Sequence, residues 1–203
     1  MLTKIYLLIN INNINFARFS HVGTWETFRE PCVNCQRTTE KLSEPLLIEW
    51  EPGSDLIGDF SWCGYSIVVL DNVKNFMIKK EFECEFGKVE VVKNSTTKRK
   101  TKMVQYPYEG PNLNWLLAKS KINLDVDKSK LELKNDCVVC NLREYKFKMD
   151  NIVIPRVNWN NEKMFKISQF NNSAATYVTR QALEELLSEG FTNFKYKEAG
   201  YIE

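Results

Sequence analysis

The sequence predicts an α+β protein with mixed β-sheets and two strand–helix–strand units. A β-branched run at 66–70 is followed by helical spacing and then by alternation up to residue 92, and the same order returns at 175–201. A third observation is a pair of CxxC motifs, at 32–35 and 137–140. Together they supply the four ligands of a tetrahedral zinc ion, so the sheets are expected to carry a zinc-ribbon-like four-cysteine site.

Length and composition are those of a soluble globular protein, with 203 residues, 43% of them hydrophobic and 27% charged. We expect one domain over 1–203, with a division into two parts, about 1–105 and about 106–203, as the alternative. The formal net charge of +2 argues against a dedicated nucleic-acid-binding protein, which would carry a clear basic excess.

The location expected from the sequence is the cytoplasm, without membrane contact. No stretch approaches the ~18 consecutive apolar residues of a membrane span. The apolar run at 5–9 is followed by asparagines rather than by a small-residue cleavage site, so it is interpreted as a strand and not as a signal peptide. Six cysteines are too few for a secreted disulfide scaffold, which favours reduced thiols.

The front of the chain is expected to be mainly β. Residues 3–18 form a strand or hairpin with asparagine turns, and 21–31 form a loop that leads to the first cysteine pair. Leu46, Leu47 and Ile48 predict a short strand that Pro52 and Gly53 end.

The first strand–helix–strand unit has the sharpest pattern. Residues 66–70 are β-branched and apolar, as in a buried strand, and Asp71 is the expected N-cap of a helix. Residues 84–92 alternate between apolar and polar, which predicts the returning strand. Three apolar residues at helical spacing mark the inner face of the helix: Val73, Phe76 and Met77.

The segment between the two units is less regular. Residues 93–102 are polar and basic and are expected to form an exposed loop. Residues 112–121 are predicted to form a short helix with Leu113, Leu116 and Leu117 on its apolar side. Residues 125–136 form a strand or a loop before the second cysteine pair, and 145–155 are expected to be extended.

The second unit repeats the order of the first. Residues 175–178 predict a strand, Thr179 caps a helix, and Gly190 ends it. The apolar face of this helix is Ala182, Leu183, Leu186 and Leu187. Val73, Phe76 and Met77 superpose on Leu183, Leu186 and Leu187 at one constant offset, so the units are either related or only similar in shape.

The predicted metal ligands are Cys32, Cys35, Cys137 and Cys140. Four thiolates leave no open coordination position, which predicts a structural rather than a catalytic zinc. Two alternatives stay open at this point. In one, the pairs lie far apart or have lost the metal, and the cysteines act as small buried hydrophobic residues. The other is a thioredoxin-like redox site, which would need a helix directly behind one CxxC. Cys63 and Cys84 lack ligand spacing and are expected in the core.

Catalytic chemistry finds little support in the sequence, and we predict that the protein is not an enzyme. His21 is the single histidine, so any histidine base would depend on this loop residue. The chain has no glycine-rich phosphate loop, no HExxH motif and no GxSxG motif.

The order of these motifs resembles the bacterial double-CXXCG motif family, which includes immunity-type proteins paired with the toxins of contact-dependent and swarming-inhibition systems. The matching features are an aromatic approach with His21, Trp25 and Pro31, the two CxxC pairs, the unit at 65–92, and a closing segment from Met164 to Tyr196. Both motif glycines are replaced, by Gln36 and Asn141. Asn tolerates the left-handed backbone conformation expected there better than Gln does.

The resemblance implies a cytoplasmic, non-enzymatic protein that binds and neutralises a cognate toxin protein. It transfers no toxin-contacting residue to this chain. The alternative function is a zinc-ribbon nucleic-acid-binding module that uses the basic run at 98–102.

Overall fold

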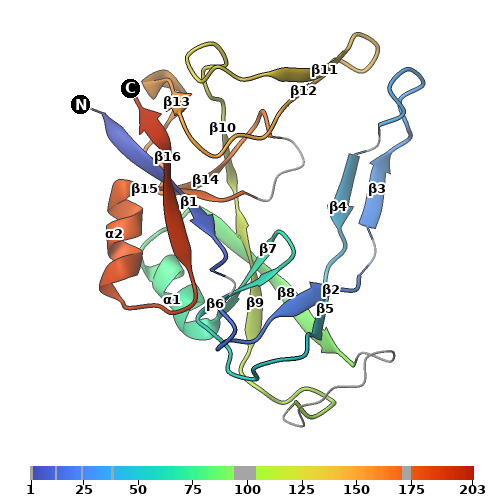
Figure 1. Cartoon of the computed structure of the whole chain (residues 1–203), viewed down its shortest axis with the longest axis vertical. Helices are drawn as coiled ribbons and strands as arrows, with labels where there is room; N and C mark the ends of the chain where they lie inside the picture. The colour runs from blue at the N-terminus through green and yellow to red at the C-terminus, as the bar shows by residue number, and fades with distance from the viewer. Residues whose placement is uncertain (1, 12, 24, 38, 94–103, 171–174) are drawn as a thin grey trace.

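The computed structural model describes residues 2–11, 13–23, 25–37, 39–93, 104–170 and 175–203, and within these ranges the chain is rich in β-strands (Figure 1). The described residues contain only two α-helices, α1 (Asp71–Lys79) and α2 (Arg180–Ser188), and one short 3-10 helix (Arg156–Asn158). The predicted α+β class is therefore right in outline, with a larger share of sheet than expected. Neither α-helix is long and apolar enough to cross a membrane.

The first sheet is a closed barrel of six strands. The predicted strands at 46–48, 66–70 and 84–92 all belong to it. Its order is β2 (Phe19–His21), β5 (Leu46–Trp50), β8 (Cys84–Val92), β9 (Leu113–Ala118), β7 (Ser66–Leu70) and β6 (Phe60–Cys63).

The second sheet has six strands and includes both ends of the chain. Its order is β10 (Ser120–Ile122), β14 (Met164–Ile167), β15 (Tyr177–Thr179), β1 (Thr3–Ile9), β16 (Lys195–Ile202) and β13 (Ile152–Ile154). The predicted N-terminal strand β1 lies between β15 and β16 and is antiparallel to both. Thr3 pairs with Ile202, so the two termini lie side by side (Figure 1).

The helix predicted at 112–121 is wrong. These residues form the strands β9 and β10, and β9 pairs with β7 on one side and β8 on the other. Leucines three and four positions apart fit a short strand buried on both faces as well as a helix. Leu113 packs in the barrel cluster and Leu116 in the cluster between the two sheets, while Leu117 is half-buried. Pairing with two neighbouring strands, which the local pattern does not report, decides the outcome.

The two helices begin differently. Thr179 is the N-cap of α2 as predicted, and its hydroxyl oxygen accepts a hydrogen bond from the Ala182 N–H at 3.3 Å. Asp71 is not the N-cap of α1: Leu70 holds that position, and Asp71 is the first helical residue. The Asp71 carboxylate instead accepts hydrogen bonds from the Asn112 and Asn114 side-chain amides, at 2.9 and 2.8 Å.

Replacing Thr179 by alanine removes the acceptor of this cap. We expect Thr179→Ala to lower the free energy of unfolding by about 1 kcal/mol, the usual cost of losing an N-cap. Thr179→Ser keeps the hydroxyl oxygen and serves as the control, expected to retain most of the stability. Urea unfolding of the three proteins measures the difference, and equal losses in both variants would show that the cap is not the cause.

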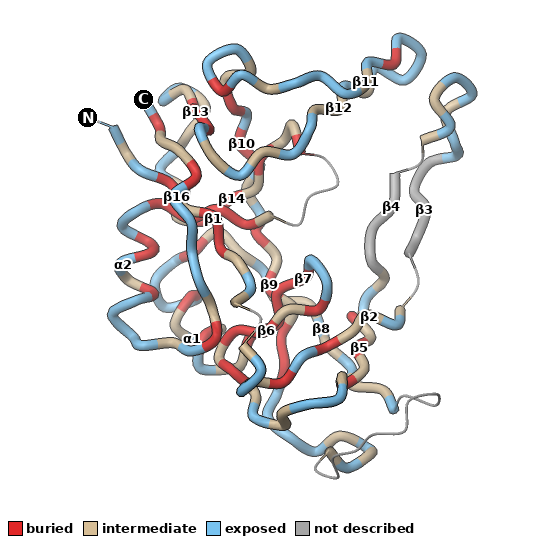
Figure 2. The backbone as a smooth tube through the Cα atoms, in the orientation of Figure 1, coloured by how far each residue is buried: buried red, intermediate tan, exposed pale blue. Residues whose placement is uncertain are grey.

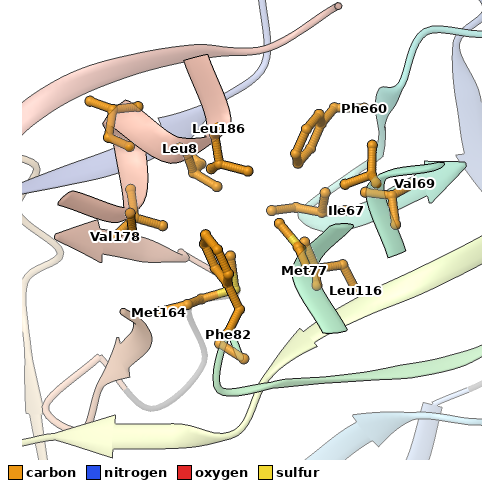
Figure 3. Close-up of a cluster of buried hydrophobic side chains, with 14 residues drawn as sticks. Leu8, Phe60, Ile67, Val69, Met77, Phe82, Leu116, Met164, Val178 and Leu186 are labelled. Carbon is orange, nitrogen blue, oxygen red and sulfur yellow. The ribbon is translucent and has the colours of Figure 1, made fainter. Parts of the chain in front are cut away.

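The largest core cluster joins the two sheets. Side chains from the barrel, such as Phe60 and Leu116, pack with Leu8, Met164 and Val178 of the second sheet (Figure 3). Both helices contribute to the same cluster. Figure 2 shows buried segments concentrated where the sheets and helices meet. The two sheets are therefore held together by a shared apolar core.

Two β-hairpins stand away from this core. One consists of β3 (Trp25–Arg29) and β4 (Thr39–Leu42), and the other of β11 (Leu133–Cys137) and β12 (Leu142–Tyr145). Their tips approach each other at the upper right of Figure 1. The first strand of the second hairpin begins within the region predicted as strand or loop at 125–136, and its second strand ends where the predicted extended segment 145–155 begins. The basic run at 98–102 lies outside the described residues.

Candidate metal centre

Each CxxC pair forms the turn of one of these hairpins. The first turn is closed by two backbone hydrogen bonds, from Gln36 N–H to the Cys32 carbonyl at 2.8 Å and from Cys32 N–H to the Arg37 carbonyl at 3.0 Å. In the second turn, Cys137 ends β11 and pairs with Leu142 at the start of β12. The two turns are thus built alike, with the first cysteine paired to the residue five positions later.

The four predicted ligands come together at the hairpin tips. The Sγ atoms of Cys32 and Cys137 are 3.7 Å apart, as are those of Cys35 and Cys140. All four sulfurs lie within 4.8 Å of one another. A tetrahedral zinc with Zn–S bonds of about 2.3 Å places its sulfurs about 3.8 Å apart, so the donor set fits such an ion. The alternative in which the two pairs lie far apart is therefore wrong.

Hydrogen bonds prepare one sulfur as a thiolate. The Asn34 side-chain amide donates to the Cys137 Sγ at 3.5 Å. Hydrogen bonding from the backbone of Cys140, followed by this Asn34 bond, lowers the pKa of Cys137 to about 6. Hydrogen bonds from the backbone of Cys35 and Asn34 also lower the pKa of Cys32.

Cys140 differs from these two cysteines. The Leu142 backbone favours its thiolate, but hydrogen bonding to Cys137 and burial outweigh this and raise the pKa of Cys140 to about 12. Without a metal, the cluster therefore mixes thiolate and thiol at neutral pH. Binding a cation that takes four thiolates would release the remaining protons.

The residue after each second cysteine has a left-handed backbone, as expected for a zinc-binding CxxC turn. Gln36 and Asn141 both have φ of 56°. This conformation costs residues other than glycine about 1 kcal/mol or more, although Asn pays less than most. Both turns therefore hold a residue other than glycine in a conformation that favours glycine, at an energetic cost.

We expect Gln36→Gly to raise the free energy of unfolding by about 1 kcal/mol, because glycine relieves the left-handed strain. Asn141→Gly should raise it less. Gln36→Ala keeps the strain and is the matched control, expected to give no gain. Thermal melts of the metal-loaded proteins test the order, and an equal gain from alanine and glycine would contradict the explanation from backbone strain.

Charged side chains connect the two hairpins beside the sulfurs. Arg37, just past the first cysteine pair, forms an ion pair with Glu144 of β12. Lys134 of β11 reaches the same carboxylate at 3.2 Å. The Arg37–Glu144 pair crosses from one hairpin to the other beside the cluster, whereas Lys134 and Glu144 belong to the same hairpin. The spacing of the cysteines does not predict the ion pair between Arg37 and Glu144. The role of Asn34 near the sulfurs could have been predicted, because Asn34 lies inside a CxxC motif.

The other candidate residues lie elsewhere. His21 is in β2, and burial lowers its pKa. Cys63 is buried and Cys84 half-buried, and burial raises the pKa of each to about 12, as expected for core thiols. In the part of the chain that the structure describes, the four cysteines are the only group of three or more His, Cys, Asp or Glu side chains close enough to hold a metal.

Neither CxxC turn is followed by a helix, because each leads directly into a strand, β4 or β12. The arrangement that a thioredoxin-like redox site needs is therefore not present at either pair. Comparison with known proteins adds no assignment: no protein-family model matches the chain, and no curated protein matches it.

Proposed function

We propose that the protein is a non-enzymatic immunity-type protein that binds and neutralises a cognate bacterial toxin, and that Cys32, Cys35, Cys137 and Cys140 hold a structural zinc ion. The observation that carries the metal assignment is the group of four sulfurs within 4.8 Å, contributed by two separate hairpins. The toxin assignment depends on the family resemblance.

The donor set favours zinc. Thiolates are soft ligands, and a tetrahedral set of four sulfurs is typical of zinc or of iron–sulfur clusters. The 3.7 Å separations match the sulfur spacing around one ion. Four protein ligands would fill the coordination sphere and leave no position for water or substrate, so the ion would act on the fold and not on a reaction.

Metal analysis of the purified protein tests this part of the proposal. We expect one zinc per chain and no absorption bands of an iron–sulfur cluster. Less than about 0.2 zinc per chain, with all four thiols freely titratable, would contradict the zinc assignment.

The binding role has two supports. The motif order resembles that of immunity-type proteins, and the nearly balanced charge of the chain suits a protein interface better than a polyanion. A zinc ion at the hairpin tips would cross-link the two hairpins and so reduce the entropy lost when a partner binds them.

The toxin hypothesis is tested in the host. If it holds, the protein captures a toxin from its own cells, and co-expression restores growth of cells that produce this toxin. A catalytically dead toxin is the control for its toxicity. No bound toxin and no rescue would contradict the hypothesis. Salt-dependent binding of DNA or RNA by the purified protein would instead favour the nucleic-acid-binding alternative, because phosphate contacts release counterions.

A further inference from the structure

The two sheets have the same strand order and the same strand directions. Position by position, β2, β6, β7, β9, β8 and β5 correspond to β10, β14, β15, β1, β16 and β13. In both sheets the first and last pairs are parallel, and the three pairs between them are antiparallel. One difference remains: β2 also pairs with β5 and closes the barrel, whereas β10 has no ladder with β13.

Equivalent elements also follow each other in the same order along the chain. The half from β1 to β8 contains two strands, a CxxC hairpin, three strands, a helix and a last strand, and the half from β9 to β16 repeats this series. Both α-helices have nine residues. Their N-caps, Leu70 and Thr179, set the offset at 109 positions, so Val73 matches Ala182. The offset predicted from the sequence was wrong by one residue.

Contacts between the halves are reciprocal. The Asp59 N–H donates to the Thr192 hydroxyl at 3.0 Å, and the Lys163 N–H donates to the Glu83 carboxylate at 2.7 Å. Asp59 and Lys163 occupy equivalent positions, directly before β6 and directly before β14. The last residue of the next strand donates to each of their carbonyls: Leu70 N–H to Asp59 and Thr179 N–H to Lys163. Thr192 and Glu83 are again 109 positions apart. Reciprocal contacts of this kind define the two-fold interface of a homodimer.

The cysteines obey the same symmetry. Cys32 corresponds to Cys137 and Cys35 to Cys140, and each Sγ lies 3.7 Å from that of its own equivalent. Atoms that a two-fold axis relates lie this close to each other only when both are near the axis. The sulfur cluster therefore marks the position of this axis. Gln36 and Asn141, with φ of 56° each, confirm that the two turns correspond residue by residue.

Each half also places its first strand in the sheet of the other half. β1 fills the space between β15 and β16, and β9 fills the equivalent space between β7 and β8. These strands bring apolar side chains into the partner sheet, with Ile5, Leu7 and Leu8 on β1 and Leu113 and Leu116 on β9 all buried.

We infer that the chain is a covalently joined pseudo-dimer: two copies of one unit, residues 3–92 and 113–202, that exchange their first strands about a two-fold axis through the cysteine cluster. The partner that each exchange surface fits is a second copy of the same unit. The connection between β8 and β9 then serves as a tether, and the interface itself holds the units together.

Cleavage of the full-length protein tests this inference. A protease recognition sequence is inserted after Lys93, at the end of the first unit, and in the control after Gly53, an exposed position with no neighbouring atom within 4 Å of an added Cβ. Each folded protein is cleaved, its fragments are separated in urea, and they are then mixed by dilution. Native mass spectrometry measures the amount of the 1:1 complex of the two fragments, and circular dichroism measures how much secondary structure is recovered.

We expect the cut after Lys93 to give at least about tenfold more reassembled complex than the cut after Gly53, because each fragment then keeps all the strands of one unit, whereas the control cut divides a unit. Equal recovery from both cuts, or no recovery from the cut after Lys93, would overturn the inference. The measurement is made with and without added zinc. The recovery of the complex can then be compared between the two cuts even if the protein binds no zinc.

Discussion

Replacing Cys137 by serine is expected to abolish metal binding and to release the two hairpins from each other. Cys137 is the most buried of the four cysteines, its Sγ lies 3.7 Å from that of Cys32, and its pKa is lowered to about 6. It is therefore the thiolate best prepared to bind first. Serine is a poor zinc ligand, and three remaining sulfurs would bind far more weakly than four.

The expected loss is large because metal binding and folding are coupled. Structural zinc sites contribute about 10–16 kcal/mol of apparent binding free energy in small zinc-finger peptides. Part of that energy is available here, so we expect Cys137→Ser to lower the melting temperature by on the order of 10 °C. A chelator that extracts the metal from the wild-type protein should lower it by a similar amount.

Zinc content, a thermal melt and hydrogen exchange check this prediction together. Exchange should rise mainly at the hairpins, since the shared core between the sheets does not depend on the metal. Cys84→Ala is the control, because this half-buried thiol lies outside the cluster. One zinc per chain in Cys137→Ser, or a melt that zinc extraction leaves unchanged, would be incompatible with a metal cross-link between the hairpins.

Replacing Phe60 by alanine should cost about 3–5 kcal/mol of unfolding free energy, the usual range for a buried aromatic residue. Phe60 is fully buried in β6, and its ring centroid lies 4.8 Å from that of Phe194 and 6.1 Å from that of Phe191. Those two rings come from the segment between α2 and β16. The substitution would therefore open a cavity between the two units and not only within one.

Urea unfolding measures this loss, with Tyr65→Ala as the control. Tyr65 lies five residues away, and its side chain is 83% exposed, so its removal should change stability by less than about 0.5 kcal/mol. Similar losses for the two variants would mean that the aromatic contacts around Phe60 do not hold the units together.

Local pattern was enough to predict several elements and the four cysteines of the candidate metal centre. The strands β5, β7 and β8, the helix after residue 70 and the cap at Thr179 all follow from side-chain periodicity and capping chemistry, which act within a few residues. The four cysteines could be identified because CxxC spacing is itself a local requirement of metal-binding turns.

Only the tertiary structure decided which of these segments are neighbours. The leucines at 113, 116 and 117 form a strand because β7 and β8 pair with it, and β1 enters the second sheet although its partners lie at the other end of the chain. The contact between Arg37 and Glu144 has the same origin. Strand pairing and side-chain contacts depend on residues that are remote in sequence, whereas turns, caps and ligand spacing depend on adjacent ones. The sequence alone therefore identified the four cysteines of the candidate metal centre, and the two-fold arrangement that unites them became visible only in the fold.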